Sequence, residues 1–142
     1  MFSPDDLIFL SPENSLPEHI EGSFARRVMV ILSSDENLPD NRAFLTKVLA
    51  AAQLNLLQDC LLVEVPASGS IALSGILKVK QPTQVLVFGI SPEQLGFRIQ
   101  VNLYQPFHFQ HTSFLFAEKL GLVEPDKNRK GQLWRALQTL FL

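Results

Sequence analysis

The chain of 142 residues carries 12 Lys and Arg against 14 Asp and Glu, and 46% of its residues are hydrophobic. This length fits one domain with its own core, and the net charge of -2 argues against a broad surface for nucleic-acid phosphates. We find no apolar run long enough to span a membrane, no basic leader and a single cysteine, and therefore expect a cytoplasmic protein without disulfides.

Residues 1–25 differ in composition from the rest of the chain. They contain three prolines, several acidic residues and one compact apolar cluster, formed by Leu7, Ile8, Phe9 and Leu10. This pattern predicts an N-terminal arm that precedes a single α/β domain over residues 26–142.

Three continuous apolar runs predict strands that are buried on both faces: residues 28–32, 60–65 and 85–90. Residues 41–54 place apolar side chains at helical spacing, and residues 70–80 suit a short helix before the third run. Strand, helix, strand, helix, strand is typical of a parallel sheet with helices on both faces. The sequence thus predicts a three-layer α/β/α fold around a mainly parallel central sheet of about four strands.

The last third of the chain gives weaker signals. Residues 99–109 alternate apolar and polar side chains around Pro106, which fits an exposed strand or a hairpin arm. Residues 114–116 form a further short apolar segment. From Asp126 onward we expect a helix that docks onto the sheet through one apolar face, made of Leu133, Trp134, Leu137, Leu140 and Phe141.

Residues that follow the apolar runs are the first candidates for chemistry, because open α/β sheets bind ligands at the carboxyl ends of their strands. Asp35 and Glu36 follow the first run and could form a general-base or metal pair, although solvated acids before a helix are the more ordinary interpretation. Neither glycine-rich phosphate-binding motif occurs, and residues 68–70 lack the pattern of a nucleophile elbow. We therefore expect no catalytic residue, no cofactor and no metal.

The remaining reactive and aromatic residues give no stronger site. His108 and His111 lie three residues apart in a non-helical stretch without a nearby carboxylate or cysteine, which fits a partner contact better than metal ligation. The phenylalanines of residues 107–116 could stack on bases. Without interleaved Arg or Lys they fit core or interface side chains better, and Cys60, inside an apolar run, fits a core position.

Two stretches resemble the psi subunit of bacterial DNA polymerase III. One is the apolar run after Arg27 that leads to Asn37-Leu38-Pro39 and a helix, and the other is Asp126-Lys127 followed by Leu133-Trp134-Arg135-Ala136-Leu137. The resemblance implies a uracil-DNA glycosylase-like fold without the catalytic motifs. It also implies a small adaptor that joins the clamp loader to the chi subunit, with protein partners and only weak direct binding of nucleic acid.

The glycosylases that share this fold provide an alternative function. They place a water-orienting acid or amide after the first strand and a histidine after a late strand. Asp35 and Asn37 occupy the first of these turns here, and His111-Thr112-Ser113 faintly resembles the second motif, so Asp35, Asn37 and His111 are candidates for a vestigial site. The glycine and proline that shape the glycosylase loops are absent, which argues against activity.

For the adaptor, we expect Leu7, Ile8, Phe9 and Leu10 to contact the partner, because an apolar cluster within a polar arm can bind in a groove. The alternative is that the arm packs on its own domain. Two further classes stay open. A domain that binds small molecules would show a deep polar pocket at the strand ends, and a structural homo-oligomer would show an exposed apolar patch around residues 107–116.

Overall fold

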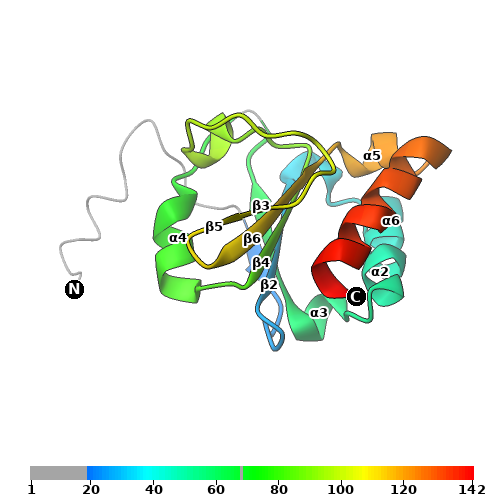
Figure 1. Ribbon diagram of the computed structural model, residues 1–142, viewed down its shortest axis with the longest axis horizontal. Helices are drawn as coiled ribbons and strands as arrows, with labels where there is room; N and C mark the ends of the chain where they lie inside the picture. Colours follow the sequence, from blue (N-terminus) through cyan, green and yellow to red (C-terminus); the bar gives the residue numbers. More distant parts are fainter. Residues whose placement is uncertain (1–18, 68) are drawn as a thin grey trace.

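The computed structural model describes residues 19–67 and 69–142, and within them the chain forms an α/β fold around a six-stranded mixed sheet (Figure 1). The strand order is β1-β3-β2-β4-β6-β5. The four inner strands are parallel, and both edge strands run antiparallel to their neighbours. The strands are β1 His19–Glu21, β2 Val28–Ser33, β3 Cys60–Val65, β4 Gln84–Phe88, β5 Phe107–Phe109 and β6 Thr112–Ala117.

The apolar runs form strands because both faces of the sheet are covered. Every residue of β2 is buried, and its register aligns Val30 with Leu62 of β3 and Leu86 of β4. These three side chains belong to one core, whereas the neighbouring Met29 and Ile31 belong to a second core on the other face. The alternation of a pleated strand thus divides one continuous apolar run between two cores.

Four helices contribute to the first core: α2 Pro39–Ala51, α3 Leu56–Asp59, α5 Leu120–Val123 and α6 Lys127–Phe141. Figure 1 shows α2 and α6 next to each other over this face. Leu45, Leu49, Leu133 and Leu137 are almost completely buried against the sheet. Asp126 caps α6, and its carboxylate accepts hydrogen bonds from the backbone N–H groups of Asn128 and Arg129.

The opposite face is covered less regularly. Its only α-helix within the described residues is α4 Leu73–Lys80, which is accompanied by the 3-10 turn η2 Glu93–Leu95. Beyond η2, residues 97–106 form an irregular segment that lies over the β6–β5 side of the sheet (Figure 1). This side of the second core is therefore closed by loop side chains in place of a helix.

The order of the connections places a reversal in the middle of the sheet. The crossover after β2 runs through α2 to β3 on one side, and the crossover after β3 runs through α4 to β4 on the other side of β2. Strand order therefore reverses between β2 and β4, where an open α/β sheet leaves a crevice at the strand ends.

The predicted α/β class is confirmed, and the runs at 28–32, 60–65 and 85–90 are strands with ends shifted by one or two residues. The sheet has six strands where about four were predicted: β1 was not predicted, and β5 lies inside the stretch of residues 99–109 that was predicted as an exposed strand or hairpin arm. β1 lies within the stretch of residues 1–25 predicted as an arm, and it pairs with β3. Backbone N–H groups of Ser23, Ala25 and Arg26 also donate to carbonyls of residues 57–59, so residues 19–26 are packed on the domain.

The stretch from Ile99 to Phe109 is also different from the prediction. Only Phe107–Phe109 is a strand, and the hairpin turns at Gln110 and His111 rather than around Pro106. Both turn residues have positive φ, at 50° and 71°, as a two-residue type I′ turn requires. No helix among the described residues combines the length and apolar character of a membrane span.

Candidate functional site

The carboxyl ends of β2 and β4 are the place where this topology would position a ligand. The segments that meet there are residues 33–38 after β2, Gly89 after β4 and Lys119 after β6. Ser33 is buried and donates a hydrogen bond from its hydroxyl to the Asp35 carboxylate. The second carboxylate oxygen of Asp35 lies 3.9 Å from Nζ of Lys119.

Lys119 packs directly on Gly89 at the same strand ends. A Cβ added to Gly89 would lie 2.4 Å from Cγ and 3.1 Å from Cα of Lys119, and the backbone φ of Gly89 is +71°. Only glycine allows this approach without strain. The stem of Lys119 therefore occupies the position beside β4, and its ammonium group is paired with Asp35.

The neighbouring polar residues, Glu36 and Asn37, also make structural contacts. Glu36 is buried, and its carboxylate accepts a hydrogen bond of 3.2 Å from the backbone N–H of Gly121 near the start of α5. Asn37 donates from its amide nitrogen to Glu64 of β3, while its buried Oδ1 has no hydrogen-bond partner within the described part of the chain. Asn37 thus bridges two strand ends with half of its amide.

The structure does not bring His111 to this place. Asp35 and Asn37 follow the carboxyl end of β2, whereas His111 lies in the turn that leads into the amino end of β6. Since the inner strands are parallel, their carboxyl and amino ends lie on opposite sides of the molecule, separated by the length of a strand, roughly 20 Å. The vestigial site expected from Asp35, Asn37 and His111 is therefore not assembled.

The other predicted residues have ordinary environments where they are described. Burial and the neighbouring Asp59 raise the pKa of the Cys60 thiol to about 12, which keeps it protonated and unreactive at neutral pH. His108 and His111 are exposed, and Nδ1 of His108 lies 3.1 Å from the Ser113 hydroxyl. No group of three metal-ligating side chains occurs in residues 19–67 and 69–142. The partner-binding candidates Leu7, Ile8, Phe9 and Leu10 lie outside the described residues.

A polar network at the end of β6 holds the start of the last helix. Glu118 accepts hydrogen bonds from the Tyr104 hydroxyl at 2.9 Å and from Nε of Arg129 at 2.7 Å. Nη1 of Arg129 also donates to Asp126 at 2.8 Å. Burial and the bond to Glu118 raise the pKa of Tyr104 to about 12, and the Arg129 backbone N–H lowers the pKa of Asp126. These shifts arise from helix capping and packing, so they do not indicate a catalytic centre.

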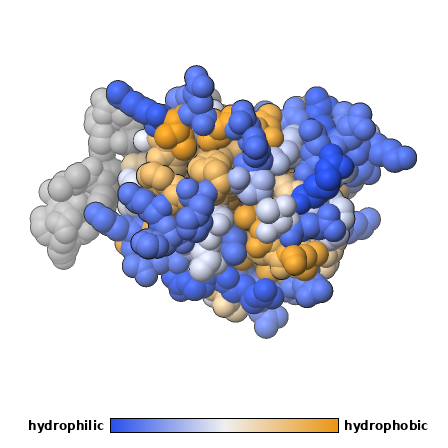
Figure 2. All heavy atoms as spheres, viewed as in Figure 1, coloured by the Kyte–Doolittle hydropathy of each residue, from blue (hydrophilic) through white to orange (hydrophobic). Residues whose placement is uncertain are grey.

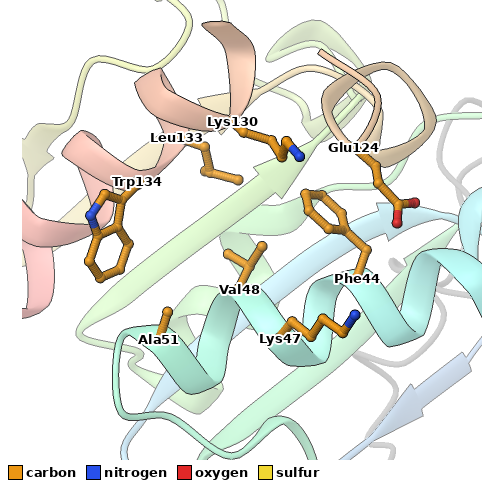
Figure 3. A pocket seen from close by; sticks show the side chains of 8 residues that line it. All are labelled: Phe44, Lys47, Val48, Ala51, Glu124, Lys130, Leu133 and Trp134. Atoms are coloured by element: carbon orange, nitrogen blue, oxygen red, sulfur yellow. The ribbon is translucent and has the colours of Figure 1, made fainter. Parts of the chain in front are cut away.

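Two hollows lie away from the strand ends. The first, which we name the α2–α6 groove, has a volume of about 380 Å³ and lies between α2 and α6. Figure 3 shows Phe44, Val48 and Leu133 turned toward one another inside it, with the Trp134 ring at one end. Charged groups stand around this apolar floor: Lys47, Lys130 and Glu124. The apolar stripe of the last helix predicts Leu133 and Trp134 as docking residues, but it does not indicate that Trp134 lines an open groove.

The second hollow has a volume of about 240 Å³ and lies between residues 96–99 and the β5–β6 hairpin. We name it the phenylalanine cavity, because its walls include five phenylalanines: Phe97, Phe107, Phe109, Phe114 and Phe116. Phe109 is 47% exposed and Ile99 41% exposed. Figure 2 shows apolar side chains gathered over the part of the molecule where β5 and residues 97–106 lie. An exposed apolar patch is thus present near residues 107–116, as a self-associating domain would require.

Neither a scan of protein-family models nor a search of curated proteins finds a match for this chain.

Proposed function

We propose that this chain is a non-catalytic adaptor, a protein-interaction domain of the kind that the psi resemblance implies. One observation carries the proposal: at the strand-end position where an α/β enzyme holds its ligand, the stem of Lys119 packs on Gly89 and its half-exposed ammonium group lies 3.9 Å from Asp35. The exposed apolar surface lies elsewhere, at the α2–α6 groove and around the phenylalanine cavity. A domain that acts through its surface requires this distribution.

The alternative of a uracil-DNA glycosylase-like enzyme loses support from the same geometry. The Asp35 carboxylate accepts a hydrogen bond from the Ser33 hydroxyl and lies 3.9 Å from Nζ of Lys119, and His111, the proposed imidazole, lies at the opposite ends of the strands. We therefore propose a uracil-DNA glycosylase-like, three-layer arrangement of the fold without the reaction. The test is incubation of the purified chain with a single-stranded oligonucleotide that contains one uracil. We expect an intact strand after alkaline treatment, and excision above the level of a buffer control would refute the proposal.

The proposed partners are clamp-loader components or a chi-like subunit, contacted through Leu7, Ile8, Phe9 and Leu10. Each large apolar side chain buried in a partner contributes about 1.5–3 kcal/mol, so two of them carry a substantial share of a micromolar affinity. The experiment measures binding of the full chain to purified clamp-loader components and compares wild type with a Leu7→Ser/Phe9→Ser variant.

A matched control is the Leu57→Ser variant, because Leu57 is an exposed apolar side chain of α3 outside the arm. We expect wild type and L57S to bind alike and the arm variant to lose binding. Absence of binding by the wild-type chain at high micromolar concentration would refute the clamp-loader assignment.

A further inference from the structure

The phenylalanine cavity is built from rings that pack against one another at the sheet edge. Phe107 stacks on Phe114 with ring centroids 5.5 Å apart and on Phe116 at 6.2 Å, and Phe97 meets Phe114 edge-on at 6.3 Å. Phe109 continues the same face of β5 and is half exposed at the rim. The hollow therefore has a preformed aromatic floor that is wide enough for one or two large apolar side chains.

A cation and a free strand edge adjoin this floor. Arg98 lines the cavity, is exposed, and takes part in none of the ion pairs formed among the described residues. Among the described residues, β5 has a sheet neighbour on one side only. In a type I′ hairpin the closing pair, Phe109 with Thr112, is hydrogen-bonded, so the backbone groups of His108 in the next pair point outward.

These features specify the chemistry of the occupant. An extended segment with large apolar side chains beside carboxylates would fill the floor, pair with Arg98 and reach the free backbone of His108. The chain contains one such sequence, Asp5-Asp6-Leu7-Ile8-Phe9-Leu10. We propose that residues 5–10 of a second copy of this chain bind at the phenylalanine cavity, with Leu7 or Phe9 in the hollow and Asp5 and Asp6 facing Arg98.

The second copy is chosen over the same molecule because of reach. His19 pairs with Glu64 near the carboxyl end of β3, whereas Phe109 lies at the amino end of β6 on the opposite sheet edge. Five strand spacings and the offset along the strands put these places roughly 30 Å apart in a straight line. The ten residues from Phe9 to His19 span at most about 36 Å when fully extended, so Phe9 of the same molecule could reach the hollow only along an almost straight path, and α4 lies across that path on this face. If each of two copies places its residues 5–10 in the phenylalanine cavity of the other, the exchange closes a symmetric dimer.

This inference goes beyond the proposed function, since it concerns a second copy and neither claim requires the other. Both use Leu7 and Phe9, so the dimer and the clamp-loader complex would compete for the same residues. The experiment measures self-association of the full chain by sedimentation velocity from low micromolar to near-millimolar concentration. We expect a concentration-dependent dimer, weakened roughly tenfold or more by Phe9→Ser, because that variant loses a large buried side chain. Failure to bind clamp-loader components would leave this result unchanged.

Reversing the charges on the two sides of the proposed contact provides the decisive test. We expect Arg98→Glu to weaken the dimer, the Asp5→Arg/Asp6→Arg variant to weaken it likewise, and the combination of all three substitutions to restore it. Arg135→Glu is the matched control, since Arg135 is an exposed cation on α6 away from the cavity. A wild-type chain that stays monomeric throughout, an R98E variant that behaves like R135E, or a combined variant without recovery would each overturn the proposal.

Discussion

Gly22 offers the sharpest test of whether residues 19–26 belong to the folded domain. Its backbone φ is +119°, and a Cβ at this position would lie 2.2 Å from the carbonyl oxygen of Cys60. That oxygen also accepts a hydrogen bond from the backbone N–H of Phe24, so it cannot move away without a further loss. Alanine at this position would have to distort β1 or displace it from β3.

The expected cost of Gly22→Ala follows from two additive effects. A non-glycine residue held in this backbone region costs about 1–3 kcal/mol. The overlap with a backbone atom cannot be relieved by side-chain rotation and adds more, which gives a total of about 2–4 kcal/mol in the free energy of unfolding. The upper limit is set by release of β1, since a detached strand no longer requires the strained geometry.

Urea denaturation followed by the fluorescence of Trp134, the only tryptophan, measures this cost. With a slope of about 2 kcal/mol per molar urea, the midpoint of G22A should fall by roughly 1–2 M. Gly75→Ala is the matched control, because a Cβ there meets nothing within 4 Å inside α4. Its midpoint should rise slightly, by the equivalent of about 0.5–1 kcal/mol. Equal midpoints for G22A and wild type would mean that residues 19–26 form a loose arm after all.

Three other side chains give tests of their own. Tyr104 is the only tyrosine, and its absorbance titration should show a pKa of about 12 in the folded chain and about 10 in urea. Because the folded pKa is the higher one, the stability that the neutral phenol contributes is complete below pH 10 and is lost as the pH rises toward 12. A titration midpoint near pH 10 for the folded chain would contradict the packing of Tyr104 against Glu118. Cys60 should react with iodoacetamide at neutral pH only through unfolding, so equal alkylation rates with and without urea would show that the thiol is not buried. Asp126→Asn should destabilise the chain at neutral pH by an amount that shrinks as the pH falls below about 4, since the stabilising effect of Asp126 is complete above the ordinary carboxyl pKa and is lost as the pH falls through its lowered folded pKa. An Asp126→Asn effect that is the same at pH 3 and pH 7 would exclude the carboxylate charge as its cause.

The inner strands and the closing helix were predictable because their signals are local. A run such as residues 28–32 is typical of a strand with both faces covered, and the cap at Asp126 followed by an apolar stripe is typical of a helix start. The sequence could not reveal β1, because its three residues carry no continuous apolar pattern. β1 is held by its pairing with β3 and by the ion pair of Glu21 with Arg42 at 2.6 Å, and both depend on tertiary structure.

The candidate site shows the same limit more clearly. Motif likeness groups Asp35 with His111, yet the direction of the strands places these residues at opposite strand ends. The contact that fills the strand ends, Lys119 on Gly89, was not foreseen, since it depends on β4 and β6 being neighbours and on the backbone bond from Gly89 N–H to Ala117. Strand order is a property of the whole chain, and no local pattern in the sequence encodes it.

The topology by itself would permit a ligand site, because the reversal of strand order between β2 and β4 leaves a crevice in any sheet of this kind. Side chains decide whether the crevice stays open. A long, charged side chain after β6 and a glycine after β4 fit together here, and the half-exposed ammonium group lies 3.9 Å from the turn acid Asp35. The same glycine that would bring a backbone close to a ligand in an enzyme instead accepts a lysine stem, and the exposed apolar surface of the described residues lies elsewhere, in the α2–α6 groove and around the phenylalanine cavity.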